Sequence, residues 1–464
     1  MKLRFAAAAA ALLTAFVLSG CGNGGGQPDL GVIDWEDRDG RAEQFVMALV
    51  NGEYAAAAAG FDAAMRRGLG ERGLQKAWED TAEAAGRFLS LAGIEVVPHD
   101  EYDIYEVLSR HEKTGIKSRV VFSPDGLVAG LFFSFAEDLA AWDMAPAVKD
   151  GYTEFPIILG EGTEYPLRGM LTVPDGVSGK VPGVVLVHGS GPQDMDETVF
   201  ENKPFLEIAE YLSANGFAVI RYDKRTYTHG AKMLQELGGS LSVWEETIED
   251  AILATEMLKA DSRIDRDRVF ILGHSLGGML APRIHAMGGD YAGLILFAGS
   301  PRSLLEIIAD QQRMAVLETL EGEALEAALE AFELADEQIA AIVNMPDDEA
   351  KATTDASGAS VYYWKDLHTH SAADYIEDIT APILVMHAGN DMQVFADKDF
   401  AGYQELLAGR DNVTFKLYEG LNHLFMPSDI TRRVDILDEY AVKANIDGQV
   451  LRDIAEWLRA FAGG

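Results

Sequence analysis

The chain has 464 residues, with 38 lysines and arginines against 75 aspartates and glutamates, which gives a formal net charge of −37. It is longer than one simple domain needs, and its 48% hydrophobic and 24% charged residues are typical of a globular protein, not of a disordered or polytopic membrane chain. So acidic a chain is repelled by a phosphate backbone, which excludes nucleic acid as a partner. An anionic bilayer repels it too, so membrane attachment would need something other than a basic patch.

The N-terminus predicts an export signal. Lys2 and Arg4 form a short positive segment, and Phe5–Leu18 is apolar but shorter than the roughly 20 residues of a membrane span. Leu18-Ser19-Gly20-Cys21 resembles the bacterial lipoprotein box, in which the cysteine carries lipid and the chain is cut before it. Cys21 is also the only cysteine, so a disulfide within the chain is excluded. We expect an extracytoplasmic protein attached to the membrane by lipid at Cys21, with an ordinary secretory signal as the alternative.

On this interpretation residues 1–20 are the signal and residues 21–40 are the lipidated cysteine with a flexible, glycine-rich tether. Residues 41–140 then predict a small α+β domain. Two segments have apolar residues at helical spacing: Ala42–Ala59 and Leu74–Ala92. Three strand-like segments follow: Tyr102–Leu108, Ile116–Ser123 and Leu127–Phe135.

The order of elements in this domain, helices and then an antiparallel sheet, is similar to that of the nuclear-transport-factor-2-like fold. Four of its residues could be taken for a site: His99, Asp103, Glu106 and His111. No second group of residues converges on them, so solvated strand faces are the favoured interpretation. We expect this domain to act as a spacer or a binding module.

Strands and helices alternate from Tyr152 onward, which predicts a mostly parallel sheet covered on both faces over residues 152–464. The predicted strands are Val181–Val187, Ala218–Tyr222, Val269–Leu272, Leu294–Phe297, Ile383–His387 and Val413–Tyr418. The predicted helices are Phe205–Asn215, Val243–Lys259, Met279–Ala286 and Val450–Phe461. The alternation stops between about residues 301 and 378, where the amphipathic segments Leu304–Leu320 and Glu323–Val343 predict an inserted helical cap.

A single G-x-S-x-G motif, Gly273-His274-Ser275-Leu276-Gly277, follows one of these strands and opens a helix. That is the context of a nucleophile elbow, a sharp turn that strains the serine backbone and exposes its hydroxyl. A plain strand-to-helix turn could use the same residues, but the position between strand and helix favours a nucleophile at Ser275.

The motif in this context resembles the α/β-hydrolase family over about Tyr152–Gly464. The segments Asp194–Glu197 and Arg221–Arg225 are similar to those of an exported, dienelactone-hydrolase-like or esterase subgroup. The resemblance implies a serine hydrolase that acts on small or medium carboxylic esters through an acyl-enzyme. True dienelactone hydrolases carry a cysteine where Ser275 stands, so their substrate is not implied.

The family's chain order, serine, then acid, then histidine, is met by Ser275, Asp391 and His423. Asp391 lies just beyond one predicted strand, and His423 follows the next. A serine hydroxyl needs an imidazole to take its proton, and a carboxylate to orient that imidazole and stabilise its cation. The other position for the acid, in the segment 298–301, offers no carboxylate. The resemblance also implies an oxyanion hole formed by the backbone N–H groups of Leu276 and Ser190.

Substrate choice is expected to depend on the cap, where Tyr362, Tyr363 and Trp364 could line an acyl or aryl pocket over Ser275. Packing of these rings onto the core is an equal alternative. We expect Asp223 and Arg225 to brace their loop by salt bridging. No metal or other cofactor is implied.

Three alternative functions remain at this point. A serine peptidase or an acyltransferase uses the same triad, and a surface binding lipoprotein could keep the fold as a scaffold. The sequence predicts no oligomeric state.

Overall fold

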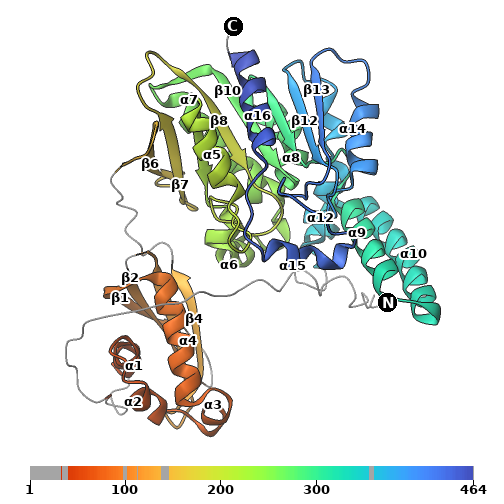
Figure 1. Cartoon of the computed structure of the whole chain (residues 1–464). Coiled ribbons are helices and arrows are strands. Elements are labelled where there is room, and N and C mark those ends of the chain that lie inside the picture. Colours follow the sequence, from red (N-terminus) through yellow and green to blue (C-terminus); the bar gives the residue numbers. More distant parts are fainter. Residues whose placement is uncertain are drawn as a thin grey trace. The chain divides into compact units, whose positions relative to one another are not determined.

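The computed structural model describes residue 33 and residues 40–97, 102–111, 113–136, 146–354 and 360–462. Contacts divide the chain into two compact units, with the division near residue 144 (Figure 1). The predicted signal, the predicted lipidation site Cys21 and the residue His99 all lie outside the described residues.

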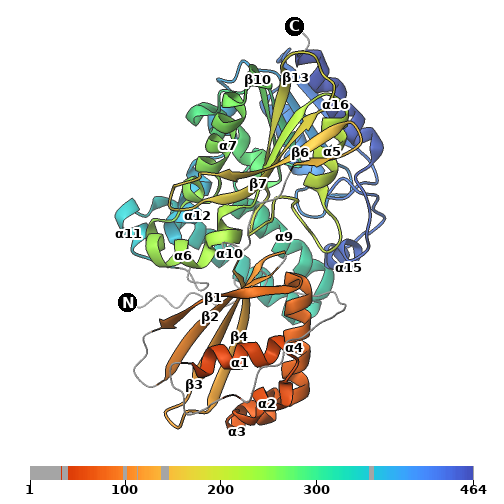
Figure 2. The same ribbon diagram turned by 90° about the vertical axis from the view of Figure 1, so that its left-hand side faces the viewer.

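The smaller unit is an antiparallel four-stranded sheet with helices packed on one face (Figure 2). Its helices are α1 (Arg41–Val50), α2 (Tyr54–Ala59), α3 (Ala63–Gly68) and α4 (Gly70–Ala85). Its strands, paired in chain order, are β1 (Phe88–Val97), β2 (Asp103–His111), β3 (Gly115–Phe122) and β4 (Val128–Ala136). The buried side chains Phe45, Leu49 and Trp78 of α1 and α4 pack against Val107 and Val120 of the sheet.

Two predicted helix boundaries in this unit are wrong. The helix expected over Leu74–Ala92 ends at Ala85, and β1 begins at Phe88. Gly86 between them has φ 82°, a conformation that favours glycine and ends the helix. The helix expected over Ala42–Ala59 is two helices, α1 and α2, separated by a turn. Alanine-rich periodicity alone does not reveal such breaks, because the same apolar pattern continues across them.

The larger unit has the predicted mostly parallel sheet, with spatial order β13-β12-β11-β10-β8-β9-β7-β6-β5. The parallel strands are β8 (Val181–Val187), β9 (Ala218–Tyr222), β10 (Ile264–His274), β11 (Leu294–Phe297), β12 (Ile383–Ala388) and β13 (Val413–Tyr418). An antiparallel edge is added by β5 (Ala147–Val148), β6 (Tyr152–Leu159) and β7 (Leu167–Pro174). This is the sheet of an α/β-hydrolase, as predicted.

Helices cover both faces of this sheet (Figures 1 and 2). Alternating residues of β8 show how: Val185 and Val187 belong to the core packed against α7 (Glu249–Ala260) and α8 (Leu276–Ile284). The intervening residues Val184 and Leu186 face α5 (Pro204–Ala214) and α16 (Gly448–Ala462). The alternation follows from the two-residue period of a strand buried on both faces.

A set of helices is inserted between β11 and β12 where the cap was predicted. It comprises α9 (Leu304–Thr319), α10 (Gly322–Asn344), α11 (Asp347–Lys351), α12 (Val361–Thr369) and α13 (Ala373–Ile376). Arg283 of α8 forms a two-pronged ion pair with Asp366 of α12, at 2.8 and 3.0 Å, and both side chains are buried. The insertion is thus bound to the helix that follows the elbow. In the part of the chain that the structure describes, no helix is both long and apolar enough to span a membrane.

Candidate active site

Ser275 lies in a strained turn between β10 and α8. Its backbone has φ 53° and ψ −116°, which a residue with a side chain rarely adopts, and its N–H donates a 2.8 Å hydrogen bond to Phe297 O. The turn needs glycine beside it, because a Cβ on Gly277 would lie 2.1 Å from Val187 O. Strain held in place by such close packing is what a nucleophile elbow requires.

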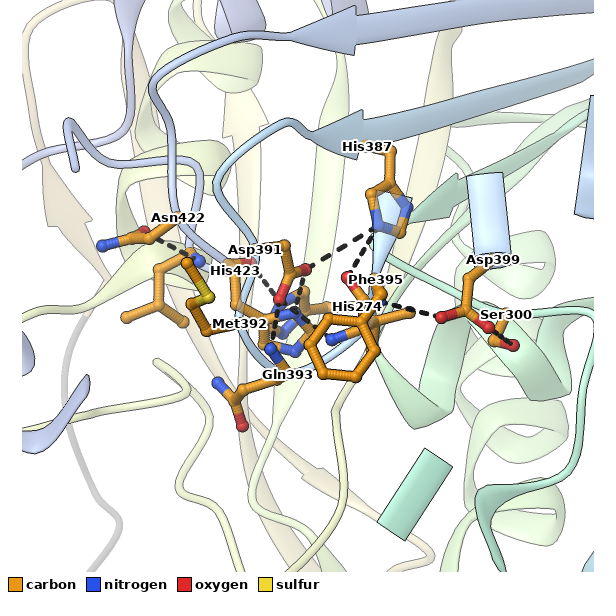
Figure 3. Close-up of polar contacts among 12 residues, drawn as sticks. His274, Ser300, His387, Asp391, Met392, Gln393, Phe395, Asp399, Asn422 and His423 are labelled. Carbon is orange, nitrogen blue, oxygen red and sulfur yellow. Dashed lines mark hydrogen bonds and ion pairs between the residues drawn. The ribbon is translucent and has the colours of Figure 1, made fainter. Parts of the chain in front are cut away.

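Asp391 and His423 meet at the carboxyl edge of the sheet, after β12 and β13. His423 Nδ1 lies 2.6 Å from Asp391 Oδ2, and both side chains are buried (Figure 3). The other carboxylate oxygen, Oδ1, accepts hydrogen bonds from the N–H groups of Gln393 and Val394 at 2.8 and 2.9 Å. Both oxygens of the Asp391 carboxylate thus have hydrogen-bond partners. These contacts fix the orientation of the carboxylate, which in turn can orient His423.

Electrostatics favour a neutral His423 with a basic Nε2. Burial lowers the pKa of His423 below its usual value, against the opposing pull of the Asp391 carboxylate. Burial disfavours the Asp391 anion, but the adjacent His423 holds the Asp391 pKa below its usual value. Because Nδ1 carries the hydrogen directed at Asp391, the unprotonated nitrogen of neutral His423 is Nε2.

His423 lies against the elbow through the residue that precedes the serine. His274 Nε2 donates to His423 O at 3.0 Å, and the two imidazole rings are 4.7 Å apart between centroids. Among the described residues, no hydrogen bond joins the Ser275 hydroxyl to His423. That bond is often long without substrate and tightens when substrate binds.

The loop after β8, residues 188–192, lies beside Ser275. A Cβ on Gly189 would be only 3.2 Å from Ser275 Cβ. The Gly189 N–H donates to Glu197 Oε1 at 2.7 Å. Ser190 is an exposed residue, and its N–H has no acceptor among the described residues. Leu276 is the first residue of α8, so its N–H has no acceptor within the helix. The N–H groups of Ser190, in the loop after β8, and of Leu276, at the start of α8, are thus available near the elbow.

A buried ion pair that sequence reasoning missed supports both loops. Glu197 Oε2 lies 2.9 Å from His274 Nδ1, and both residues are less than 5% exposed. The other nitrogen of His274 faces the His423 carbonyl oxygen, so both ring nitrogens lie beside acceptors, an arrangement that favours the imidazolium form. Burial opposes both charges, yet each partner outweighs it: the pKa of His274 is raised and that of Glu197 is lowered.

Asp223 and Arg225, which were predicted to brace the loop after β9 by salt bridging, both contact residues of other segments. Asp223 accepts a hydrogen bond from the Met195 N–H at 2.8 Å, so it holds the loop that follows β8. Arg225 forms ion pairs with Asp250 and Glu249. Lys224, the residue between them, was given no role from the sequence, yet it is 2% exposed and its ammonium contacts the loop after β8.

The three aromatic residues predicted to line a pocket lie on α12 and are partly buried. Tyr363 and Trp364 pack against the core cluster beneath the cap, and the Tyr363 hydroxyl donates to Glu246 Oε2 at 2.6 Å. The Tyr362 ring lies 4.4 Å from Lys351 Nζ. The contacts of Tyr363 and Trp364 are those of cap packing, and a role for the three rings in substrate binding stays a prediction.

No group of three or more His, Cys, Asp or Glu side chains within the described ranges is arranged to hold a metal ion. His188 and His387 each bond to a backbone carbonyl, those of Asp194 and Val394, at 2.9 Å. Burial lowers the pKa of His188 to about 4, so its ring is neutral and donates from Nε2. Both histidines brace loops at the edge of the sheet.

Comparison with known proteins gives matches for both units. Residues 184–429 match the family described as "Serine aminopeptidase, S33", and residues 42–131 match a family described as a protein of unknown function, DUF3887. Over 429 residues the chain is 33% identical to "Esterase EstD" of Thermotoga maritima, covering 92% of this chain and 97% of that relative.

Solved structures with a similar arrangement include Est1E from Butyrivibrio proteoclasticus, which is 16% identical with a TM-score of 0.41. The match covers 67% of this chain and 99% of Est1E. A putative dienelactone hydrolase from Klebsiella pneumoniae is 13% identical with a TM-score of 0.38, covering 67% of this chain and 98% of that chain.

Proposed function

The chain belongs to the serine aminopeptidase (S33) family and is a serine hydrolase, and we propose that it cleaves carboxylic esters through an acyl-enzyme formed on Ser275. The observation that supports this most is the position of the Asp391–His423 pair against the elbow that carries Ser275. The similarity to an esterase over 92% of the chain favours an ester over an amide substrate.

In this mechanism His423 Nε2 takes the proton of the Ser275 hydroxyl as Oγ attacks the acyl carbon. The carbonyl oxygen becomes an oxyanion, which accepts hydrogen bonds from the N–H groups of Ser190 and Leu276. Protonated His423 then gives its proton to the departing alcohol. Water, activated by the same imidazole, attacks the acyl-enzyme and releases the acid with a free serine.

Asp391 supplies orientation and charge in this cycle. The imidazolium formed in each half of the reaction lies 2.6 Å from the carboxylate, in a buried setting where that attraction is strong. The carboxylate stays ionised because the Gln393 and Val394 N–H groups and His423 all stabilise its anion.

Labelling with a fluorophosphonate probe tests the nucleophile. The intact protein should be labelled, and both labelling and ester hydrolysis should be lost in Ser275→Ala. Ser190→Ala keeps the backbone N–H and serves as the matched serine control, which should still be labelled. Labelling of Ser275→Ala at the wild-type level contradicts the assignment.

The substrate class is separated by a second assay, because the family's description names an aminopeptidase while the relative is named an esterase. Esters of p-nitrophenol with increasing acyl length are compared with aminoacyl anilides and with transfer to added alcohols. We expect ester hydrolysis to dominate and chain-length preference to change when Tyr362 or Trp364 is replaced by alanine. Faster cleavage of anilides than of esters indicates a peptidase instead.

We also propose that Cys21 carries lipid and anchors the enzyme, as an extracytoplasmic protein, to a bacterial cell membrane. The motif Leu18-Ser19-Gly20-Cys21 after a short apolar segment supports this. Cys21→Ser should move the protein from the membrane fraction to the soluble exported fraction, with hydrolysis unchanged in detergent extract. Membrane retention of Cys21→Ser contradicts the anchor.

A further inference from the structure

Lys224 places a positive charge inside the larger unit, directly behind the loop that follows β8. Its side chain is 2% exposed, and lysine is almost never so buried unless its ammonium is paired. The Nζ atom lies 2.7 Å from Glu246 Oε1, which balances the charge, and donates to Gly189 O at 2.8 Å. A lysine in this setting has two fixed partners and one of them is the peptide beside Ser275.

That peptide is the one that carries the Ser190 N–H. Because a peptide is planar and trans, the Gly189 carbonyl and the Ser190 N–H point in opposite directions in one rigid plane. A hydrogen bond that fixes the direction of the carbonyl therefore fixes the direction of the N–H. The Gly189 N–H, on the preceding peptide, is held by Glu197 at 2.7 Å, so the chain is fixed on both sides of Gly189.

The cap reaches the same lysine through one further residue. Tyr363 of α12 donates to Glu246 Oε2 at 2.6 Å, and Oε1 of the same carboxylate pairs with Lys224. Glu246 is 4% exposed and lies in the π-helical turn Trp244–Ile248. A continuous series of polar contacts thus joins the cap to the candidate oxyanion donor: Tyr363, Glu246, Lys224 and the Gly189–Ser190 peptide.

We propose that Lys224 is a positioning residue that aims the Ser190 N–H at the oxyanion, and that Tyr363 couples this alignment to docking of the cap. The inference rests on the proposed function, since it presumes the oxyanion of an acyl transfer. The Lys224 ammonium does more than fix the direction of the Ser190 N–H. It also polarises the Gly189–Ser190 peptide, and the N–H of a polarised peptide is a stronger hydrogen-bond donor.

The expected signature is kinetic. An oxyanion donor acts mainly in the transition state, so misalignment lowers kcat and leaves KM nearly unchanged. A general loosening of the fold or of the pocket would instead change KM and the folded fraction. Affinity for a tetrahedral adduct separates the two further, because only the adduct places a negative oxygen in the oxyanion hole.

The test uses the full-length protein with p-nitrophenyl esters and an alkyl boronic acid. The double variant Lys224→Met, Glu246→Gln removes the lysine without leaving a charged carboxylate unpaired, and Tyr363→Phe removes one hydroxyl only.

We expect kcat to fall by about a hundredfold or more in the double variant and by about twofold to tenfold in Tyr363→Phe. KM should stay within about twofold of wild type, and the inhibition constant of the boronic acid should rise by the same factor as kcat/KM falls. Adding Tyr363→Phe to the double variant should have no further effect, because its path through Lys224 is already lost.

Two variants are matched controls. Lys259→Met removes another lysine that donates to backbone carbonyls, those of Gly289 and Asp290. Tyr375→Phe removes another tyrosine hydroxyl between β11 and β12, which contacts His370. Both should keep the wild-type kcat and boronic acid affinity.

If the double variant folds and has wild-type kcat, the positioning role of Lys224 is overturned. If Tyr363→Phe has wild-type kcat, the proposed coupling between docking of the cap and alignment of the Ser190 N–H is overturned. In both cases fluorophosphonate labelling of wild type at Ser275 shows that the proposed function itself stands. If wild type shows neither fluorophosphonate labelling nor ester hydrolysis, the proposed function and this inference are overturned together.

Discussion

Glu197 Oε2 lies 2.9 Å from His274 Nδ1, and this buried pair joins the loop after β8 to the residue that precedes Ser275. Glu197 also holds the Gly189 N–H, and His274 also holds the carbonyl of His423. One ion pair therefore connects the three loops that carry the candidate oxyanion donor, nucleophile and base. It is a stabilising element whose strength depends on pH.

Replacing Glu197 with glutamine should show that dependence. The His274 pKa is raised above 6.5, so its contribution is complete below pH 6.5 and is lost as pH rises through the folded-state pKa. The Glu197 pKa is lowered below 4.5, so its contribution is complete above pH 4.5 and is lost as pH falls through that pKa. Between these values Glu197→Gln should lower the free energy of unfolding by up to about 3–5 kcal/mol. Urea unfolding from pH 4 to pH 9 measures it, and a cost that is constant with pH contradicts the pairing.

The pH profile of hydrolysis should report His423. The base must be neutral to accept the serine proton, so kcat/KM rises with pH as His423 loses its own proton. Since burial lowers the pKa of His423, the midpoint of this rise should lie below its usual value of 6.5. Initial rates from pH 4 to pH 9 give the midpoint. A midpoint above 6.5 would mean that the cation is favoured and that the electrostatic account is wrong.

Asp391→Asn should lower kcat by about four orders of magnitude while the fold is retained. The amide keeps an oxygen for the Gln393 and Val394 N–H groups, but it no longer holds His423 in the required tautomer or stabilises its cation. Asp223→Asn is the matched control, because Asp223 also accepts a backbone N–H, that of Met195, and its replacement leaves both members of the Asp391–His423 pair in place. Equal losses in both variants would contradict a special role for Asp391.

The sequence was sufficient to predict the α/β-hydrolase sheet, because the apolar strands of a parallel sheet stand out at the sequence level. Val181–Val187, Ala218–Tyr222, Leu294–Phe297 and Val413–Tyr418 were predicted with the observed boundaries. The antiparallel edge strands β6 and β7 were not predicted individually. Most residues of β6 are only partly buried, which weakens its apolar pattern, and the mostly buried β7 has Arg168, Gly169 and Thr172 among its apolar residues.

The candidate triad residues could be chosen from motif and chain order, but the residues that support them could not. Glu197, Lys224 and Glu246 act through contacts between segments far apart in the chain, and a charged residue gives no sign in sequence that it is buried. The available signals were weaker: Glu197 and Lys224 lie in the segments Asp194–Glu197 and Arg221–Arg225 that resemble a hydrolase subgroup, and Lys224 is the second residue after a fully buried strand, at the edge of the sheet where the site lies.

Gly277→Ala should distort the elbow and the neighbouring loop. Its Cβ would lie 2.1 Å from Val187 O and 2.8 Å from His188 O, so the end of β8 must move. We expect a loss of about 1–3 kcal/mol or more in unfolding free energy, with at least a tenfold loss in kcat, as the oxyanion loop is displaced. Gly230→Ala is the control, because nothing lies within 4 Å of its Cβ and alanine favours the helix there. Wild-type kcat in Gly277→Ala would show that the turn can relax without moving the loop.

The Arg283–Asp366 pair should decide how firmly the cap is docked. Both side chains are 6% exposed, so Arg283→Met leaves a buried carboxylate whose nearest remaining ion-pair partner, the His370 imidazole, is 3.9 Å away. We expect a loss of about 3–5 kcal/mol and faster hydrogen exchange in α12, while exchange in β10 stays slow. Adding Asp366→Leu should recover much of the loss, because a well-packed apolar pair avoids the unpaired charge.

The matched control for this pair is Arg432→Met. Arg432 pairs with Asp435 at the surface, where the two side chains are 57% and 33% exposed, so its loss should leave the free energy of unfolding nearly unchanged. If Arg283→Met is no more destabilising than Arg432→Met, the buried pair does not hold the cap. If α12 exchanges faster but kcat is unchanged, docking of the cap through Arg283 is independent of the Tyr363 contact. A joint fall in kcat and in α12 protection is expected, because Tyr363 and Asp366 lie on the same helix and must move together.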